Sequence, residues 1–193
     1  MIRHLLTDLD GVIRRWNNRP SIEGPLTSEA IAAVAFRTEF VQKAITGVWS
    51  DEAWRAAVVA ELLDRYPSAE ASVAVWSGYI GEVDWDVMSV LAESAFADNL
   101  ILITNATSRL KNDLLSLGLL DRFRHVVNAS EVGHAKPDRR IFEHALSLSG
   151  ATPAEVAFVD DQPVNVAAAE AVGIRSHRFE SPSRLRAFLR DLA

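Results

Sequence analysis

Short apolar runs alternate with amphipathic segments over most of the chain. Five runs have the length and apolar content of buried strands and end in polar or small residues: 2–10, 99–106, 124–130, 155–161 and 173–179. Between and after these runs, apolar residues recur at helical spacing over 109–120, 138–150, 163–173 and 182–192. This alternation predicts a parallel sheet whose strands are joined by crossover helices.

The stretch between the first two expected strands has a different pattern. Its Gly, Pro and Asn residues predict a loop over 11–27, and a helical period then runs from Thr27 to about Ala97 without a convincing strand. The expected helices cover 28–45 as one segment, 51–66 with Ser50 as its N-cap, 68–81, and 85–96. The predicted fold class is therefore α/β. It has a parallel-sheet core of residues 1–13 and 85–193, with helices on both faces, and an inserted small all-helical cap of residues 14–84.

Composition narrows the range of functions. The chain has 193 residues, of which 49% are apolar, enough for a large core, and it has no cysteine, which excludes disulfides and thiolate chemistry. The net charge of -6 argues against nucleic-acid binding. The N-terminus lacks the features of a signal peptide, and no apolar run is long enough to span a bilayer. We therefore expect a cytoplasmic protein without nucleic-acid or membrane partners.

Polar residues collect at the ends of four expected strands or in the loops after them. They are Asp8 and Asp10, Thr104 and Asn105, Lys136, and finally Asp160 and Asp161. In an open parallel sheet, ligands bind beyond the carboxyl ends of the strands, so this topology can bring these residues together. Crowded carboxylates repel one another unless a cation is present, and Mg²⁺ prefers carboxylate oxygens beside substrate phosphates. One carboxylate of the first pair can attack as a nucleophile while the other handles protons.

Four segments in this order resemble the motifs of the haloacid dehalogenase (HAD) superfamily, in its phosphatase branch with a small helical cap after the first strand. The segments are DLDGV at 8–12, LITNAT at 102–107, AKPDRRIF at 135–142 and FVDDQPVNVAAAEAVGI at 158–174. Each is weak alone, but together, each in its expected strand or loop, they are specific. The resemblance covers nearly the whole chain outside the cap and implies a Rossmann-like core.

The resemblance also implies an activity, the Mg²⁺-dependent hydrolysis of a small phosphorylated metabolite. Asp8 is the implied nucleophile and forms an aspartyl-phosphate, while Asp10 protonates the leaving alcohol and then activates water. Thr104 and Lys136 are implied to bind the phosphoryl group, and Lys136 also to steady Asp8. Asn105, beside Thr104, joins them as a phosphate-binding candidate.

The implied metal site draws on four acids. The resemblance assigns Mg²⁺ to the Asp8 carboxylate, the Asp10 backbone carbonyl and Asp161, with Asp160 ligating directly or through water. Taken alone, Asp8 and Asp10 would instead suit a turn at a strand end. Asp160 and Asp161 could cap the helix that begins at Pro163.

Substrate specificity is expected to come from the cap, where the sequence is least informative. Trp16 is placed at the pocket mouth, whereas Trp49, Trp54 and Trp76 are assigned to the cap core. Arg14 and Arg15 are either contacts for an anionic substrate or surface charge. A sugar phosphate is one candidate substrate, and the oligomeric state is not readable.

Four other functions compete with the phosphatase. A phosphomutase uses the same acids, whereas a 2-haloacid dehalogenase lacks the second Asp of the first motif, which is present here as Asp10. A receiver-like signalling domain also clusters acids, a Thr and a Lys around magnesium, but Lys136 precedes the second acidic pair here and a long cap interrupts the chain. A silent binding protein would have lost a nucleophile or a metal acid, and none is lost.

Overall fold

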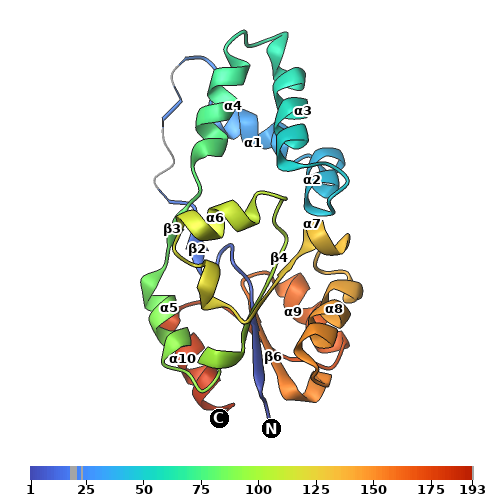
Figure 1. The fold of residues 1–193 in the computed structure, drawn as a ribbon. Coiled ribbons are helices and arrows are strands. Elements are labelled where there is room, and N and C mark those ends of the chain that lie inside the picture. Colours follow the sequence, from blue (N-terminus) through green and yellow to red (C-terminus); the bar gives the residue numbers. More distant parts are fainter. Residues whose placement is uncertain (18–20, 23, 193) are drawn as a thin grey trace.

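A five-stranded sheet forms the centre of the larger part of the molecule (Figure 1). The computed structural model describes residues 1–17, 21–22 and 24–192. In spatial order the strands are β5 (His125–Asn128), β4 (Leu100–Thr104), β1 (His4–Thr7), β6 (Val156–Asp160) and β7 (Arg175–Arg178). Every neighbouring pair is parallel, so the carboxyl ends of all five strands lie at one edge of the sheet. The five predicted strands and their parallel arrangement are confirmed.

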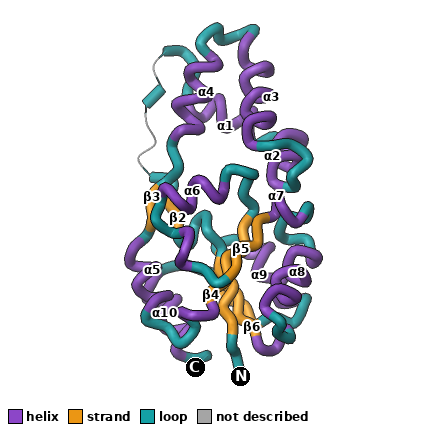
Figure 2. The backbone as a smooth tube through the Cα atoms, in the orientation of Figure 1, coloured by secondary structure: helices purple, strands orange, loops and turns teal. Residues whose placement is uncertain are grey.

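Helices cover both faces of this sheet, as Figure 2 shows. Side chains alternate between the faces, so that Leu5 packs with one apolar cluster and Leu6 with the other. The first face is covered by α5 (Trp85–Ala92), α6 (Leu110–Ser116) and α10 (Pro182–Arg190), and the second by α8 (Arg139–Ser149) and α9 (Pro163–Ala171). A short α7 (Ala129–Val132) follows β5, and three 3-10 turns cover Ala97–Asn99, Leu120–Arg122 and Pro153–Glu155. The predicted α/β fold class is confirmed.

Strand β1 occupies the position that matters for ligand binding. It lies between β4 and β6, so the chain leaves β1 toward one side of the sheet and later returns on the other side. Such a reversal of strand order opens a crevice at the carboxyl ends of the strands, where open α/β sheets bind ligands. Asp8 follows β1 directly, and its backbone N–H extends the ladder by donating to the carbonyl of Val159 at 2.9 Å.

Four helices between β1 and β4 form a separate unit, here called the cap helices. They are α1 (Ser28–Ala35), α2 (Thr38–Ile45), α3 (Asp51–Leu63) and α4 (Ala69–Gly78). They enclose an apolar cluster of their own, which includes Ile31, Trp54, Val58 and Trp76. Ser50 is the N-cap of α3, as predicted, since its hydroxyl accepts a hydrogen bond from the backbone N–H of Ala53 at 3.2 Å. No helix in the described ranges is long and apolar enough to cross a membrane.

The structure corrects two expectations about this stretch. A two-stranded antiparallel sheet joins β2 (Arg14–Arg15) to β3 (Glu82–Val83), although the sequence predicted a loop at the first and no strand at the second. Strands of two residues carry no detectable period, and their partners are remote in sequence. The single helix predicted over 28–45 is two helices, because Arg37 between them has an extended ψ of 139°. Residues 18–20 and 23 of the predicted loop lie outside the described residues.

The cap helices contact the core at defined points. Gly47, after α2, has a φ of +74°, and a Cβ there would lie 2.0 Å from the carbonyl oxygen of Ser130 in α7. Only glycine permits this approach. At the start of α3, the backbone N–H of Asp51 donates to the hydroxyl of Ser108 at 2.9 Å. These contacts hold the cap helices against the carboxyl edge of the sheet.

The packing of α8 yields a stability prediction. Phe142 is 0% exposed and meets Phe158 edge-on at 5.4 Å between ring centroids, whereas Leu148 on the same helix is 42% exposed. We expect Phe142→Ala to lower the free energy of unfolding by about 3–5 kcal/mol, because it leaves a cavity in the core. Leu148→Ala should change it by no more than about 0.5 kcal/mol. Urea denaturation followed by circular dichroism measures both, and equal effects would contradict the assignment of this face to the core.

Candidate active site

A buried lysine lies between two aspartates at the carboxyl edge of the sheet. Lys136 Nζ lies 2.8 Å from Asp8 Oδ1 and 2.7 Å from Asp160 Oδ2. The three residues are 4%, 6% and 0% exposed, respectively. They come from the ends of the neighbouring strands β1 and β6 and from the loop before α8. The parallel register therefore brings together groups that are more than 120 residues apart in sequence, since Asp8 and Lys136 differ by 128 positions.

The backbone at Lys136 is clamped by Asn105. The side-chain amide nitrogen of Asn105 donates to the backbone carbonyl of Lys136 at 2.8 Å. The backbone N–H of Lys136 donates to the side-chain oxygen of Asn105, also at 2.8 Å. Asn105 follows β4, so it ties the lysine loop to the centre of the sheet. Its side chain positions Lys136 in this structure, and its role in phosphate binding stays a prediction. Thr104 ends β4, is buried, and lines the same cavity as Asp8 and Lys136.

Asp160 is held by three protein donors. Its oxygens accept from Lys136 Nζ, from the backbone N–H of Gln162 at 2.8 Å and from the Asn165 amide at 3.1 Å. Asn165 is 6% exposed and lies in the first turn of α9, so it orients Asp160 from the helix that follows β6. The helix expected over 163–173 places Asn165 near its start, but the sequence pattern does not indicate that its side chain is buried against Asp160.

Asp161 offers a carboxylate oxygen that could ligate a cation. Its Oδ2 accepts from the Gln162 side chain at 2.6 Å, whereas its buried Oδ1 has no hydrogen-bond partner among the described residues. One carboxylate oxygen from each of Asp8, Asp160 and Asp161 lies within 4.8 Å of the others. Gly11, with φ +82°, leaves room for this group, since a Cβ there would lie 2.5 Å from Asp161 Oδ2. An unsatisfied buried oxygen among three carboxylates fits a hard divalent cation such as Mg²⁺.

Burial sets the electrostatics of this cluster. It raises the pKa of Asp8 to about 7, against the opposing effect of the Lys136 ammonium and together with the charge of Asp160. Burial also raises the pKa of Asp161. Burial alone would lower the pKa of Lys136, but the Asp8 and Asp160 carboxylates outweigh it, so the pKa is raised and the lysine stays charged. The site favours added positive charge, because desolvated carboxylates are stabilised by a nearby cation.

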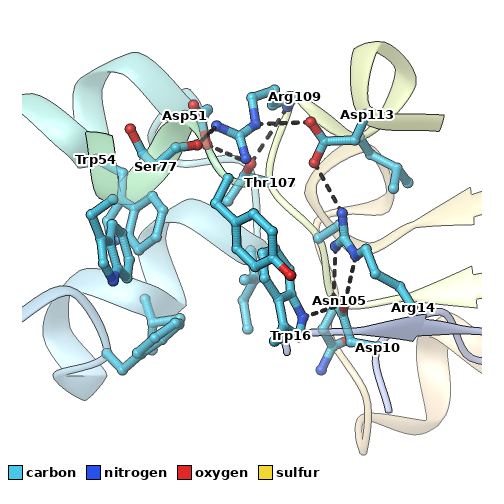
Figure 3. A pocket seen from close by; sticks show the side chains of 17 residues that line it. Asp10, Arg14, Trp16, Asp51, Trp54, Ser77, Asn105, Thr107, Arg109 and Asp113 are labelled. Carbon is cyan, nitrogen blue, oxygen red and sulfur yellow. Dashed lines mark hydrogen bonds and ion pairs between the residues drawn. The ribbon is translucent and has the colours of Figure 1, made fainter. Parts of the chain in front are cut away.

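Asp10 lines the same cavity as this cluster, but its carboxylate is bound by Arg14 and Trp16. Its Oδ1 accepts from Arg14 Nε at 2.7 Å and from Trp16 Nε1 at 2.8 Å, and its Oδ2 accepts from Arg14 Nη2 at 2.9 Å (Figure 3). Arg14 is only 4% exposed, so it is not the surface charge that the sequence allowed. The Asp10 carboxylate does not belong to the acidic group formed by Asp8, Asp160 and Asp161.

A chain of ion pairs continues from Arg14 to the cap helices. Arg14 Nη1 lies 3.0 Å from Asp113 Oδ2 in α6, and Arg109 Nε lies 3.0 Å from Asp113 Oδ1. Arg109 also donates to the carbonyl of Ser77 in α4 at 2.5 Å (Figure 3). The sequence analysis did not identify Asp113 or Arg109. Their (i, i+4) spacing predicts a helix-surface pair, and nothing local indicates that both lie under the cap helices.

Two adjoining cavities meet at Asp10. The first contains Asp8, Thr104, Lys136 and Asp161. The second, of about 330 Å³, lies between the cap helices and the core. Three residues line both cavities, namely Asp10, Trp16 and Asn105. A molecule bound beside Asp8 therefore has a path past Asp10 to the cap helices.

Comparison with known proteins identifies the family of the chain. Residues 2–173 match the family model described as haloacid dehalogenase-like hydrolase. The chain belongs to this family. It is 39% identical over 79 residues to a phosphoserine phosphatase from Thermus thermophilus, covering 40% of this chain and 32% of that protein. It is 28% identical over 150 residues to the human haloacid dehalogenase-like hydrolase domain-containing protein 3, covering 74% of this chain and 59% of that protein.

Solved structures of HAD proteins share the fold. A HAD family enzyme from Bacteroides thetaiotaomicron, in complex with magnesium and inorganic phosphate, superposes with a TM-score of 0.72 at 18% identity, covering 93% of this chain and 95% of that one. An L-2-haloacid dehalogenase from Xanthobacter autotrophicus gives a TM-score of 0.65 at 20% identity, covering 92% and 77%. Phosphate-bound and dehalogenase structures thus have one fold, so the site residues must decide between their chemistries.

The ion pairs beneath the cap helices yield a second stability prediction. Asp113 is 7% exposed and serves both Arg14 and Arg109. Asp113→Asn should lower the free energy of unfolding by about 3 kcal/mol, because it removes the carboxylate charge that is shared by two guanidiniums. The exposed Asp121 provides a matched control, for which Asp121→Asn should cost about 0.5 kcal/mol or less. Thermal and urea unfolding measure the difference, and a stability equal to that of the control would refute the structural role of Asp113.

Proposed function

We propose that this HAD-family protein is a Mg²⁺-dependent phosphatase that hydrolyses a small phosphomonoester through an aspartyl-phosphate on Asp8. The observation that carries the proposal is the buried Asp8–Lys136–Asp160 group, with Lys136 Nζ within 2.8 Å of both carboxylates. A charged lysine beside a nucleophilic carboxylate can hold that carboxylate and the phosphoryl oxygens at once. We also propose the division into a core of 1–13 and 85–193 and a cap of 14–84, which the packing of α5 against α10 in the core supports.

The environment of Asp8 supports its role as the nucleophile. Its Oδ1 accepts from the backbone N–H of Leu9 at 2.7 Å and lies 2.8 Å from Lys136 Nζ. Its Oδ2 accepts no hydrogen bond from the described residues, so this oxygen is the one that attacks phosphorus. The new Asp8–phosphorus bond forms as the bond from phosphorus to the leaving oxygen breaks. Thr104 and Lys136 bind the transferring phosphoryl oxygens.

Asp10 is suited to the proton transfers, because its carboxylate lies where the two cavities meet. In the first step the Asp10 carboxyl gives its proton to the leaving oxygen. In the second step its carboxylate takes a proton from the water that attacks the aspartyl-phosphate, which releases inorganic phosphate and restores Asp8. Arg14 and Trp16 aim this carboxylate through three hydrogen bonds.

The oxygen ligands around Asp161 fit Mg²⁺. Asp8 and Asp161 would hold the ion through their carboxylates and Asp10 through its backbone carbonyl, with Asp160 as a direct or water-mediated ligand. When bound, Mg²⁺ neutralises charge on the carboxylates and on the phosphoryl group. Lys136 and Asn165 keep Asp160 in place, so the cluster is preorganised for the ion.

Asp10 also favours phosphoryl transfer over dehalogenation. A dehalogenase needs no acid at this position, since its halide leaves without a proton. Here Asp10 is retained and is fixed by two side chains. A phosphomutase shares these acids and differs only in the fate of the phosphoryl group, so release of inorganic phosphate distinguishes the two.

The nucleophile assignment gives a direct prediction. Asp8→Asn should lower Mg²⁺-dependent phosphate release by roughly a thousandfold or more, because the amide cannot form the covalent intermediate. Asp98→Asn, at an exposed position in the Ala97–Asn99 turn, should retain the wild-type rate. Phosphate release is measured across a panel of phosphorylated metabolites with Mg²⁺ present. The phosphatase proposal fails if the wild-type protein binds Mg²⁺ yet releases phosphate from no member of the panel.

Metal binding can be tested without turnover. Mg²⁺ at 100 times its dissociation constant should stabilise the wild-type protein by about 2.7 kcal/mol, provided that it binds only the folded state. Asp161→Asn should remove this stabilisation, since it replaces the carboxylate that has a free buried oxygen. Asp98→Asn should keep it. Thermal unfolding with Mg²⁺ and with EDTA measures the effect, and an unchanged Mg²⁺ response in Asp161→Asn would exclude this residue as a ligand.

A further inference from the structure

The second cavity of the site has an apolar wall built by the cap helices. The cap helices and the junction between α1 and α2 contribute five large apolar residues to its lining: Phe36, Val41, Ile45, Trp54 and Trp76. Three of these rings contact one another, with centroid distances of 6.2 Å for Phe36–Trp54, 6.0 Å for Phe36–Trp76 and 6.0 Å for Trp54–Trp76. Ala106 and Leu110 add apolar surface from the core.

Phe36 is exposed at this wall. It lines the cavity and keeps 54% of its surface exposed, whereas Trp54 and Trp76 are 7% and 8% exposed. It is held at the junction of α1 and α2, where Arg37 interrupts the helix. An apolar group in the cavity would cover this ring and would gain the favourable burial of both surfaces.

The charged residues of the cavity are already paired within the protein. Arg14 binds Asp10 and Asp113, and Arg109 binds Asp113 and the Ser77 carbonyl. The remaining carboxylate, Asp51, pairs with Arg55 Nε at 2.7 Å and accepts from the Thr107 hydroxyl at 2.8 Å. The described lining thus contains three carboxylates (Asp10, Asp51, Asp113) and two guanidiniums (Arg14, Arg109), and no cation in it is left for a second anionic group.

The polar groups of the cavity are largely engaged as well. Trp54 Nε1 donates to the Ala35 carbonyl at 3.0 Å, Trp16 Nε1 donates to Asp10, and the Tyr79 hydroxyl donates to the Asn17 carbonyl. The Asn105 amide is committed to the Lys136 backbone. A polyol placed here would leave hydroxyls without partners, which is unfavourable in a desolvated pocket.

We infer that the substrate is a phosphomonoester whose leaving group is uncharged and predominantly apolar, such as an aryl or arylalkyl alcohol. This inference rests on the proposed phosphatase function, since it places the phosphoryl group at Asp8 and the leaving group past Asp10. The aromatic wall binds the leaving group. Because both guanidiniums of the lining are already paired with carboxylates, the cavity disfavours a carboxylate or a second phosphate. The substrate class thereby moves away from sugar phosphates and phosphoamino acids.

The test compares the phosphates of four primary alcohols, which share the type of leaving oxygen but differ in polarity and charge. They are benzyl phosphate, 4-carboxybenzyl phosphate, phosphoserine and glucose 6-phosphate. Benzyl phosphate should have the highest kcat/KM, and the remote carboxylate of 4-carboxybenzyl phosphate should lower it by about tenfold or more. A higher kcat/KM for any of the other three would overturn the inference and leave the phosphatase function standing.

Substitutions of Phe36 test whether the aromatic wall of the cavity causes the preference for an apolar leaving group. Phe36→Ala should lower the ratio of kcat/KM for benzyl phosphate to that for acetyl phosphate by about tenfold, whereas Phe36→Leu should retain most of it. Phe40 is the matched control, because it packs against the apolar cluster of the cap helices and pairs with Trp49 but does not line the cavity. Phe40→Ala should keep the wild-type ratio. Equal ratios in Phe36→Ala and wild type would refute the role of this wall.

Binding without turnover separates the two proposals. Benzylphosphonate, which cannot be hydrolysed, should bind at least about tenfold more tightly than 4-carboxybenzylphosphonate in calorimetric titrations with Mg²⁺. This order of affinities in a protein that hydrolyses no phosphomonoester would support the pocket while the proposed function failed. The reverse order would overturn the inference whatever the activity.

Discussion

The structure of the site depends on the ammonium of Lys136, held within 2.8 Å of both Asp8 and Asp160. Two neighbouring parallel strands end in the carboxylates of Asp8 and Asp160, and burial raises the pKa of Asp8. The lysine charge lets them share one buried place, and Asn105 and Asn165 fix the lysine backbone and the Asp160 carboxylate on either side of it. The same arrangement leaves Asp161 Oδ1 unsatisfied. The same packing therefore pairs Lys136 with two carboxylates and leaves an Asp161 oxygen that suits a cation.

A second set of ion pairs links this chemistry to the cap helices. Asp10 is bound by Arg14, Arg14 by Asp113, and Asp113 by Arg109, which reaches the Ser77 carbonyl in α4. Each contact is at least partly shielded from water, so each guanidinium depends on its carboxylate partner. Because these charges bind one another, they leave the adjoining cavity apolar in character. The network that orients Asp10 therefore also removes the cations that a charged substrate would need.

The family fold carries more than one chemistry, and the similar solved structures include a protein with bound phosphate and a haloacid dehalogenase. The backbone cannot distinguish between them. The proposed function attributes the distinction to side chains at the strand ends, Asp10 above all, and to the lining that the cap helices contribute. It assigns the reacting groups to the core residues and the choice of leaving group to the cap residues beside them.

The sequence by itself determined the parallel sheet and the convergence of Asp8, Thr104, Lys136 and Asp160, because parallel strands place their carboxyl ends at one edge whatever their separation along the chain. It could not show that Arg14 is buried or that α1 and α2 are separate helices. The first depends on the short pairing of β2 with β3, and the second on a single extended residue within a continuous apolar pattern. Only the tertiary structure decided the character of the cavity, because its aromatic rings and ion pairs come from segments that meet only when the cap helices pack on the core.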